Sequence, residues 1–171
     1  MTLQSLRLPK LVESDPRGVN LLQRLTAHTR PVRAGSTAFI IVARYGGLEE
    51  IVKSAYRAGR VVRGLETAER TLAAEARGMS LVDRSSGVKR GSRVSRLLLL
   101  ANDGSDGFFR QVENLLKRHV PRVLAVRLDV DAAGLGGPLF GAGRTTRLLM
   151  IQHKEAVAEL LLGLAEQFGN E

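Results

Sequence analysis

The chain has 171 residues, of which 44% are hydrophobic, enough for one domain with an extension or at most two very small domains. Cysteine is absent, which excludes disulfide bonds, thiolate catalysis and metal sites ligated by cysteine. The 26 basic residues outnumber the 17 acidic ones, and the formal charge of +9 is typical of a protein that binds a polyanion, with nucleic acid ahead of an anionic membrane. No apolar run reaches the ~20 residues of a membrane-spanning helix.

Residues 1–36 are predicted to form an N-terminal extension of an α/β domain that spans residues 37–171. They hold three of the five prolines and show little regular pattern beyond a helix-like stretch at residues 19–27. Their arginine, leucine and serine content is also found in organelle presequences, but Glu13 and Asp15 interrupt it, and presequences are poor in acidic residues. A cytoplasmic location is therefore expected, with the mitochondrial matrix as the alternative.

The first part of the domain is predicted as strand, helix, short strand and helix. Residues 37–43 form an apolar run of the buried-strand type, followed by two glycines. Residues 48–58 repeat apolar side chains at helical spacing and are followed by a glycine that suits a C-cap. A short step at residues 61–62 leads through Gly64 to a predicted helix over residues 66–76, whose first turn is acidic.

Residues 78–93 are predicted to be a basic insertion in the domain. The segment is rich in arginine, serine and glycine, and it holds Arg84, Lys89, Arg90 and Arg93 against a single acidic residue. Such a composition cannot bury enough apolar surface to fold alone. We therefore expect a loop or hairpin that becomes ordered on a partner.

The second half of the chain alternates strand-like and helix-like stretches. Apolar runs at residues 94–101, 123–128 and 146–151 predict strands, and amphipathic spacing at residues 108–119 and 154–168 predicts helices. This alternation is typical of a small α/β domain with a largely parallel sheet.

The glycine-rich segment at residues 134–143 invites comparison with nucleotide-binding loops. A dinucleotide fingerprint requires glycine where Leu139 stands, and a Walker loop requires glycine at Pro138 and lysine at Arg144. Both loops also open a helix at whose N-terminus the phosphate lies, whereas a strand is predicted next here. A conformationally special loop that lies against a backbone is therefore favoured over a mononucleotide site.

Acidic residues follow two of the predicted strands. Asp103 and Asp106 suit a carboxylate pair for acid–base or Mg²⁺ chemistry, and Asp129 and Asp131 suit the completion of an acidic cluster. The favoured alternative is that Ser105 or Asp106 caps the helix that begins near residue 108.

No catalytic or metal-binding constellation is predicted. The three histidines are scattered, and none stands at the i, i+4 spacing that places two ligands on one helix face. His119 is interpreted as the C-terminal cap of a helix. The serines lack the glycine elbow of a nucleophile. We expect neither a cofactor nor a metal.

Several stretches, taken in order, resemble the superfamily of kink-turn RNA-binding proteins that includes the ribosomal proteins L-seven-Ae and L-thirty-e. They are residues 48–64, residues 97–105, Val120-Pro121, the Leu135-Gly136 turn with Gly141, and the closing strand and helix. The resemblance implies a three-layer α-β-α sandwich with a small mixed, largely parallel sheet. It also implies an RNA face made of the glycine before the second helix, that helix's first turn, and the loop after the third long strand.

Carried over residue by residue, Gly64, Glu66, Thr67 and Arg70 occupy the family's Gly-x-Asn-Glu-x-x-Lys positions. Gly64 is identical to the family residue, Arg70 replaces lysine, Glu66 replaces asparagine and Thr67 replaces glutamate. The opposing loop corresponds to residues 135–137.

The expected function is that of a non-catalytic protein that binds structured RNA, in a cytoplasmic or mitochondrial ribosome or as a ribosome-associated factor. Its expected partners are rRNA and neighbouring ribonucleoprotein subunits, and no membrane. The alternatives are a substrate-recognition domain related to RNA 2'-O-methyltransferases, and a protein–protein scaffold that uses the leucines of the closing helix. The residues expected to contact RNA are Arg57, Arg60, Arg63, Gly64, Glu66, Thr67, Arg70, Arg84, Lys89, Arg90, Arg93, Leu135, Gly136 and Gly137.

Overall fold

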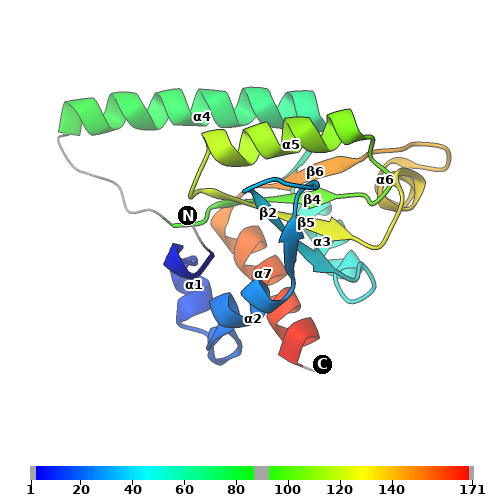
Figure 1. Ribbon diagram of the computed structural model, residues 1–171, viewed down its shortest axis with the longest axis horizontal. Helices are drawn as coiled ribbons and strands as arrows, with labels where there is room; N and C mark the ends of the chain where they lie inside the picture. The colour runs from blue at the N-terminus through cyan, green and yellow to red at the C-terminus, as the bar shows by residue number, and fades with distance from the viewer. Residues whose placement is uncertain (1–2, 87–92, 170–171) are drawn as a thin grey trace.

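The computed structural model describes residues 3–86 and 93–169, which form a six-stranded mixed sheet between two layers of helices (Figure 1). The predicted α/β sandwich is thereby confirmed. The strands are β1 (Thr29–Pro31), β2 (Phe39–Ala43), β3 (Val61–Arg63), β4 (Arg96–Leu100), β5 (Val123–Leu128) and β6 (Leu148–Ile151). The helices are η1 (Leu3–Ser5), α1 (Lys10–Glu13), η2 (Pro16–Gly18), α2 (Leu21–Ala27), α3 (Glu49–Arg57), α4 (Leu65–Ser86), α5 (Asp106–Arg118), α6 (Ala132–Phe140) and α7 (Lys154–Gly169).

The sheet has the strand order β1-β2-β5-β4-β6-β3, and its centre is parallel. β5 pairs in parallel with both β2 and β4, whereas β1, β6 and β3 pair antiparallel with their neighbours. The amino ends of β2, β5 and β4 therefore lie along one edge of the sheet, and their carboxyl ends lie along the opposite edge. These are called the amino edge and the carboxyl edge below.

The central strands are apolar on both faces because both faces are covered by helices. In β4, Leu97 and Leu99 enter one core, while Leu98 and Leu100 enter the other. α3 and α7 cover the first face, and α4 and α5 cover the second (Figure 1). The leucines of α7 are buried in the first core, as expected for a helix that packs on the sheet.

The N-terminal segment that was predicted to be an extension packs against the same core as α7. Leu8, Val12, Leu21 and Leu25 are each at most 3% exposed. The helix-like stretch at residues 19–27 is confirmed as α2. β1 completes the segment by adding to the edge of the sheet beside β2. The sparse pattern of these residues reflects short elements separated by prolines rather than a lack of packing.

α4 is longer than predicted, and the expected loop that begins at residue 78 is wrong as far as residue 86. The helix continues through Gly78, which faces open space, into the helix-compatible stretch that contains Met79 and Leu81. Its 22 residues make it about 33 Å long, and its C-terminal half extends past the end of α5 (Figure 1). Lys89 and Arg90 lie outside the described residues.

The expected glycine-rich loop is also wrong, because residues 132–140 form the helix α6. Asp131 caps this helix, its Oδ1 accepting a hydrogen bond of 2.7 Å from the Gly134 N–H. Leu135 anchors the helix in the core with no exposed surface. The cap and the anchor outweigh the low helix propensity of three glycines and one proline.

Candidate nucleic-acid interface

Arg63 and Gly64 lie where β3 meets α4, beside α6 and the segment before β6. The Arg63 guanidinium donates a hydrogen bond of 2.9 Å to the Thr145 carbonyl and lies 4.1 Å from the centre of the Phe140 ring. Gly64 has a φ of 91°, which favours glycine, and its N–H donates to the Leu148 carbonyl at 2.9 Å. The backbone conformation at this position therefore explains why residue 64 is a glycine.

Glu66, Thr67 and Arg70 are exposed on the first turns of α4, next to that junction. Arg70 contacts only Thr67, through a long hydrogen bond of 3.5 Å, among the interactions found in the described part of the chain. These three side chains are thus accessible to a partner.

The expected RNA face is corrected at Leu135 and Gly136, because both residues are buried. A Cβ on Gly136 would lie 2.7 Å from the Arg144 carbonyl oxygen and 2.8 Å from the Thr145 carbonyl carbon. The close approach that this glycine permits is to the protein's own backbone. Gly137, by contrast, is partly exposed, and a Cβ on it would meet no atom within 4 Å.

The other expected arginines are scattered. Arg57 is exposed at the end of α3, whereas Arg60 pairs with Glu155 at 3.4 Å. Arg84 lies near the far end of α4, about 30 Å from Gly64 at 1.5 Å per helical residue. Arg93 is held by Glu13 at 2.8 Å. The structure therefore does not bring the expected arginines together on one surface.

At the carboxyl edge, the acidic residues serve the protein's own backbone. Asp129 accepts a hydrogen bond of 2.7 Å from the Tyr45 N–H, and Asp103 accepts one of 3.1 Å from the Ala132 N–H. Ser105 caps α5 through a 3.1 Å bond from Phe108, which confirms the capping interpretation. Within residues 3–86 and 93–169, no three histidine or acidic side chains are grouped as a metal site.

The amino edge carries three adjoining hollows, which together we call the amino-edge groove. The outer hollow, about 940 Å³, lies under the second half of α4 beside the start of β4. The basic hollow, about 500 Å³, lies between α4 and the end of α5 and shares Met79 and Arg122 with the outer hollow. The apolar hollow, about 350 Å³, lies between α5, β2 and η1 and shares Val120 with the basic hollow.

Positive charge dominates the groove. Glu75 is the one carboxylate among the described residues that line it. Glu13 and Glu113 pair from outside with Arg93 and Lys117, so among the described side chains seven cations face three carboxylates, and a surplus of four positive charges remains. The seven cations are Lys10, Arg84, Arg93, Arg96, Lys117, Arg118 and Arg122.

Glu75 holds two of these arginines in place. Its carboxylate accepts a 2.6 Å hydrogen bond from Arg96 Nη2 and a 3.3 Å bond from Arg122 Nη2. The three side chains are between 16% and 23% exposed, so the pairing is stronger than that of a surface ion pair. The arginines are therefore ordered before any partner arrives.

His119 and Arg122 line the basic hollow, and each has a buried polar atom without a partner among the described residues. His119 is 7% exposed, and its Nε2 has no hydrogen-bond partner in the described part of the structure; the same is true of the buried Arg122 Nη1. Burial lowers the pKa of His119, and the neighbouring charges of Arg118 and Arg122 lower it further. The imidazole is thus held neutral at physiological pH.

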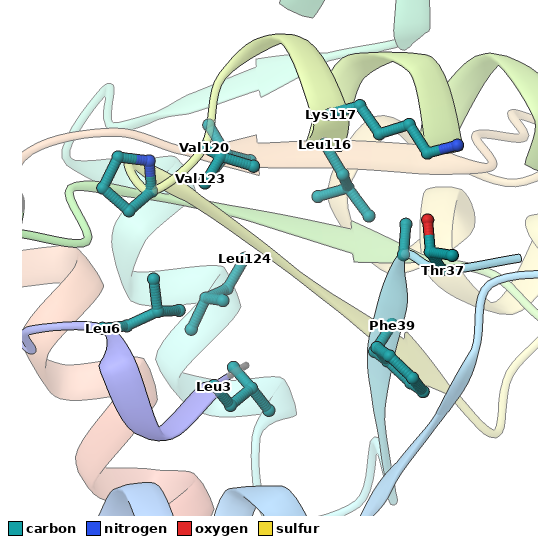
Figure 2. A pocket seen from close by; sticks show the side chains of 11 residues that line it. Leu3, Leu6, Thr37, Phe39, Leu116, Lys117, Val120, Val123 and Leu124 are labelled. Carbon is teal, nitrogen blue, oxygen red and sulfur yellow. The ribbon is translucent and has the colours of Figure 1, made fainter. Parts of the chain in front are cut away.

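The apolar hollow presents an aromatic side chain. Phe39 is 50% exposed on β2, and Val120 is 48% exposed at the end of α5. Figure 2 shows Leu116, Leu124 and Leu3 between Phe39 on one side and Leu6 on the other. A flat apolar ligand that enters here meets the Phe39 ring.

Sequence reasoning did not single out Lys117, Arg118 and Arg122, which line the groove. The signal was the basic run around Pro121, between a helix and a strand, of which only His119 was interpreted, as a helix cap. That interpretation is confirmed by the backbone, because the His119 N–H donates to the Leu115 carbonyl at 3.1 Å. What the run could not reveal is that it faces α4 and the start of β4.

No protein-family model matches the chain, and no curated protein matches it. It is similar to a solved structure described as a protein with unknown function from Bacillus halodurans C, with 15% identity and a TM-score of 0.42, covering 66% of this chain and 92% of that chain. Among the described residues, no helix combines the length and apolarity needed to cross a membrane.

Proposed function

We propose that the protein is a non-catalytic RNA-binding protein that contacts RNA through the amino-edge groove. The observation that carries this proposal is the surplus of four positive charges among the described residues of three adjoining hollows, whose described lining holds a single carboxylate. Cations so arranged neutralise backbone phosphates and release condensed counterions, which is the main source of affinity for nucleic acid.

The arrangement of the cations along the groove favours a polymeric anion over a small one. Its cations come from α1, α4, α5 and the starts of β4 and β5, and they follow one another across the edge of the sheet. Lys10, Arg84 and Arg118 have no ion-pair partner within the described residues, so their charges are available. Phosphates spaced along a chain match such a row better than one compact ligand does.

RNA is preferred to DNA because of the resemblance to the kink-turn superfamily. The exposed Glu66, Thr67 and Arg70 lie on the first turns of α4, and Arg84 of the groove follows 14 to 18 residues later, about 21–27 Å along the helix. We infer that a structured RNA spans both ends of the helix, as in a ribosome or another ribonucleoprotein. The scaffold alternative loses the surface assigned to it, because Leu160, Leu161, Leu162 and Leu164 are each at most 7% exposed.

A salt titration of RNA binding tests the proposal. Fluorescence anisotropy with a labelled structured RNA should show a linear fall of log K with log salt, with a slope of about −2 or steeper. The double variant Arg84→Gln/Arg118→Gln should weaken binding and reduce the magnitude of the slope by about 1 to 2. The matched control Arg17→Gln/Lys53→Gln, on η2 and α3 at the opposite face of the sheet from α4, should leave the slope nearly unchanged.

Two results would overturn the proposal. One is the absence of binding at low salt, or an affinity that does not depend on salt. The other is an equal loss of affinity in the two double variants, which would show that total charge rather than the groove governs binding.

A further inference from the structure

Two residues that line the basic hollow have buried polar atoms that lack hydrogen-bond partners among the described residues. His119 is more than nine-tenths buried, and its Nε2 joins Arg122 Nη1 as a buried atom without a hydrogen bond among the described residues. A buried polar group without a partner costs free energy, and native structures keep few of them. Both residues line the same hollow, so a ligand group bound there lies beside both side chains.

The charges around these atoms select an anion. Arg84 and Arg118 also line the hollow, and neither has an ion-pair partner within the described part of the chain. The C-terminal end of α5 opposes an anion with roughly half a negative charge, which three guanidinium groups outweigh. Guanidinium forks match the oxygen geometry of phosphate.

A base-sized apolar site adjoins this anion site. Val120 lines both hollows, and the apolar hollow beyond it has the half-exposed Phe39 ring on its wall (Figure 2). Nucleic-acid bases stack on exposed aromatic rings in proteins that bind single strands. The neighbouring Lys117 places a further cation at the mouth.

We propose that the two hollows together hold one nucleotide, with its phosphate between His119, Arg118 and Arg122 and its base against Phe39. This inference rests on the RNA-binding function proposed above and specifies one subsite of it. The phosphate belongs either to an RNA strand whose base is turned out of the helix or to a free nucleotide.

Binding of small probes to the full chain tests the subsite. In calorimetric titrations, adenosine 5'-monophosphate should bind at least tenfold more tightly than inorganic phosphate or adenosine alone. In NMR spectra, phosphate and the nucleotide should shift the His119 ring signals and raise the pKa of His119, because an anion offsets the charges of Arg118, Arg122 and Arg84. The carboxylate of Glu75, which pairs with Arg122, already raises that pKa in the free protein. Adenosine should not raise it.

Exposed residues provide variants that keep the fold. Arg118→Gln should lower the affinity for both the nucleotide and phosphate about tenfold. Phe39→Ala should lower the affinity for the nucleotide and leave that for phosphate unchanged. Arg110→Gln, a control of equal charge change at the carboxyl edge, should alter neither.

Competition then identifies the source of the phosphate. If a single-stranded RNA without terminal phosphates displaces the nucleotide, the site binds a phosphate within an RNA strand. If this RNA does not displace it, the site binds a free nucleotide. The inference is overturned if millimolar phosphate and nucleotide leave His119 unchanged, or if Phe39→Ala weakens both ligands equally. If either result is found while salt-dependent RNA binding persists, the nucleotide subsite is refuted and the proposed function is not. If the protein binds the nucleotide but no RNA, the proposed function is refuted instead.

Discussion

Gly136 and Gly137 are adjacent glycines of α6 whose replacement by alanine should have opposite effects on stability. A Cβ on Gly136 would lie 2.7 Å from the Arg144 carbonyl oxygen and 2.8 Å from the Thr146 amide nitrogen, which is closer than real Cβ contacts come. Because both neighbours are backbone atoms, α6 or the segment before β6 must move. A Cβ on Gly137 meets nothing within 4 Å.

The magnitudes follow from two competing terms. Alanine in place of glycine inside a helix stabilises by about 0.5–1 kcal/mol, and this gain applies to both positions. At Gly136 the overpacking costs about 1–3 kcal/mol and outweighs the gain. Gly136→Ala should therefore destabilise by about 1–2 kcal/mol, while Gly137→Ala should stabilise by up to about 1 kcal/mol. For a chain of this size, a change of about 1 kcal/mol shifts the Tm by about 2–4 °C.

Urea unfolding followed by circular dichroism measures both free energies under identical conditions. Gly137→Ala is the matched control, because it changes the same residue type in the same helix. If Gly136→Ala proved as stable as Gly137→Ala, the close packing of α6 on the segment before β6 would be refuted. The explanation of Gly136 by the protein's own backbone would fall with it.

Three further predictions concern buried polar groups. Glu75→Gln should lower the free energy of unfolding by about 2 kcal/mol, because Arg96 and Arg122 lose their shared carboxylate. The affinity for RNA should not fall with it. A loss of affinity in a binding titration would contradict the proposed role of the groove. Tyr45 has a pKa raised to about 12, mainly by burial, so the folded state keeps its proton longer than the unfolded chain and stability should fall as the pH rises from about 10 to 12. Tyr45→Phe should remove the late phase of an absorbance titration at about 295 nm. It should not lower stability at neutral pH, because the Tyr45 hydroxyl has no partner among the described residues. An unchanged titration would show that the raised pKa belongs to another tyrosine. Because the pKa of His119 is lowered in the folded state, the unfolded chain takes up a proton near pH 6.5 before the folded protein does. The free energy of unfolding should therefore decline below that pH. In urea unfolding measured at a series of pH values, His119→Gln should flatten this decline.

Some features of the fold were readable from local sequence because they depend on local physics. The apolar runs predicted β2, β4, β5 and β6, since strands covered on both faces must be apolar throughout. Ser105 was readable as the cap of α5, because a serine before a helical stripe has a preferred local hydrogen bond. The helix at residues 48–58 was readable from its amphipathic spacing, and it corresponds to α3.

Other features depended on contacts between distant residues and were predicted wrongly or missed. The composition of residues 78–86 suggested a loop, but helix propagation from the packed half of α4 continues through them. The glycines of α6 suggested a loop, but Leu135 anchors a helix in the core. The role of Gly136 became visible only when the segment before β6 was placed against it.

The sequence by itself determined the α/β class, the apolar strands and the excess of positive charge, because these depend on composition and on spacing along the chain. Only the tertiary structure decided where that charge gathers. The parallel pairing of β5 with β2 and β4 brings the starts of all three strands to one edge, beside the end of α5. The second half of α4 then lies over residues that are distant in sequence, such as Arg118 and Arg122. A binding groove made from such separate segments follows from strand order, which no local pattern in the chain encodes.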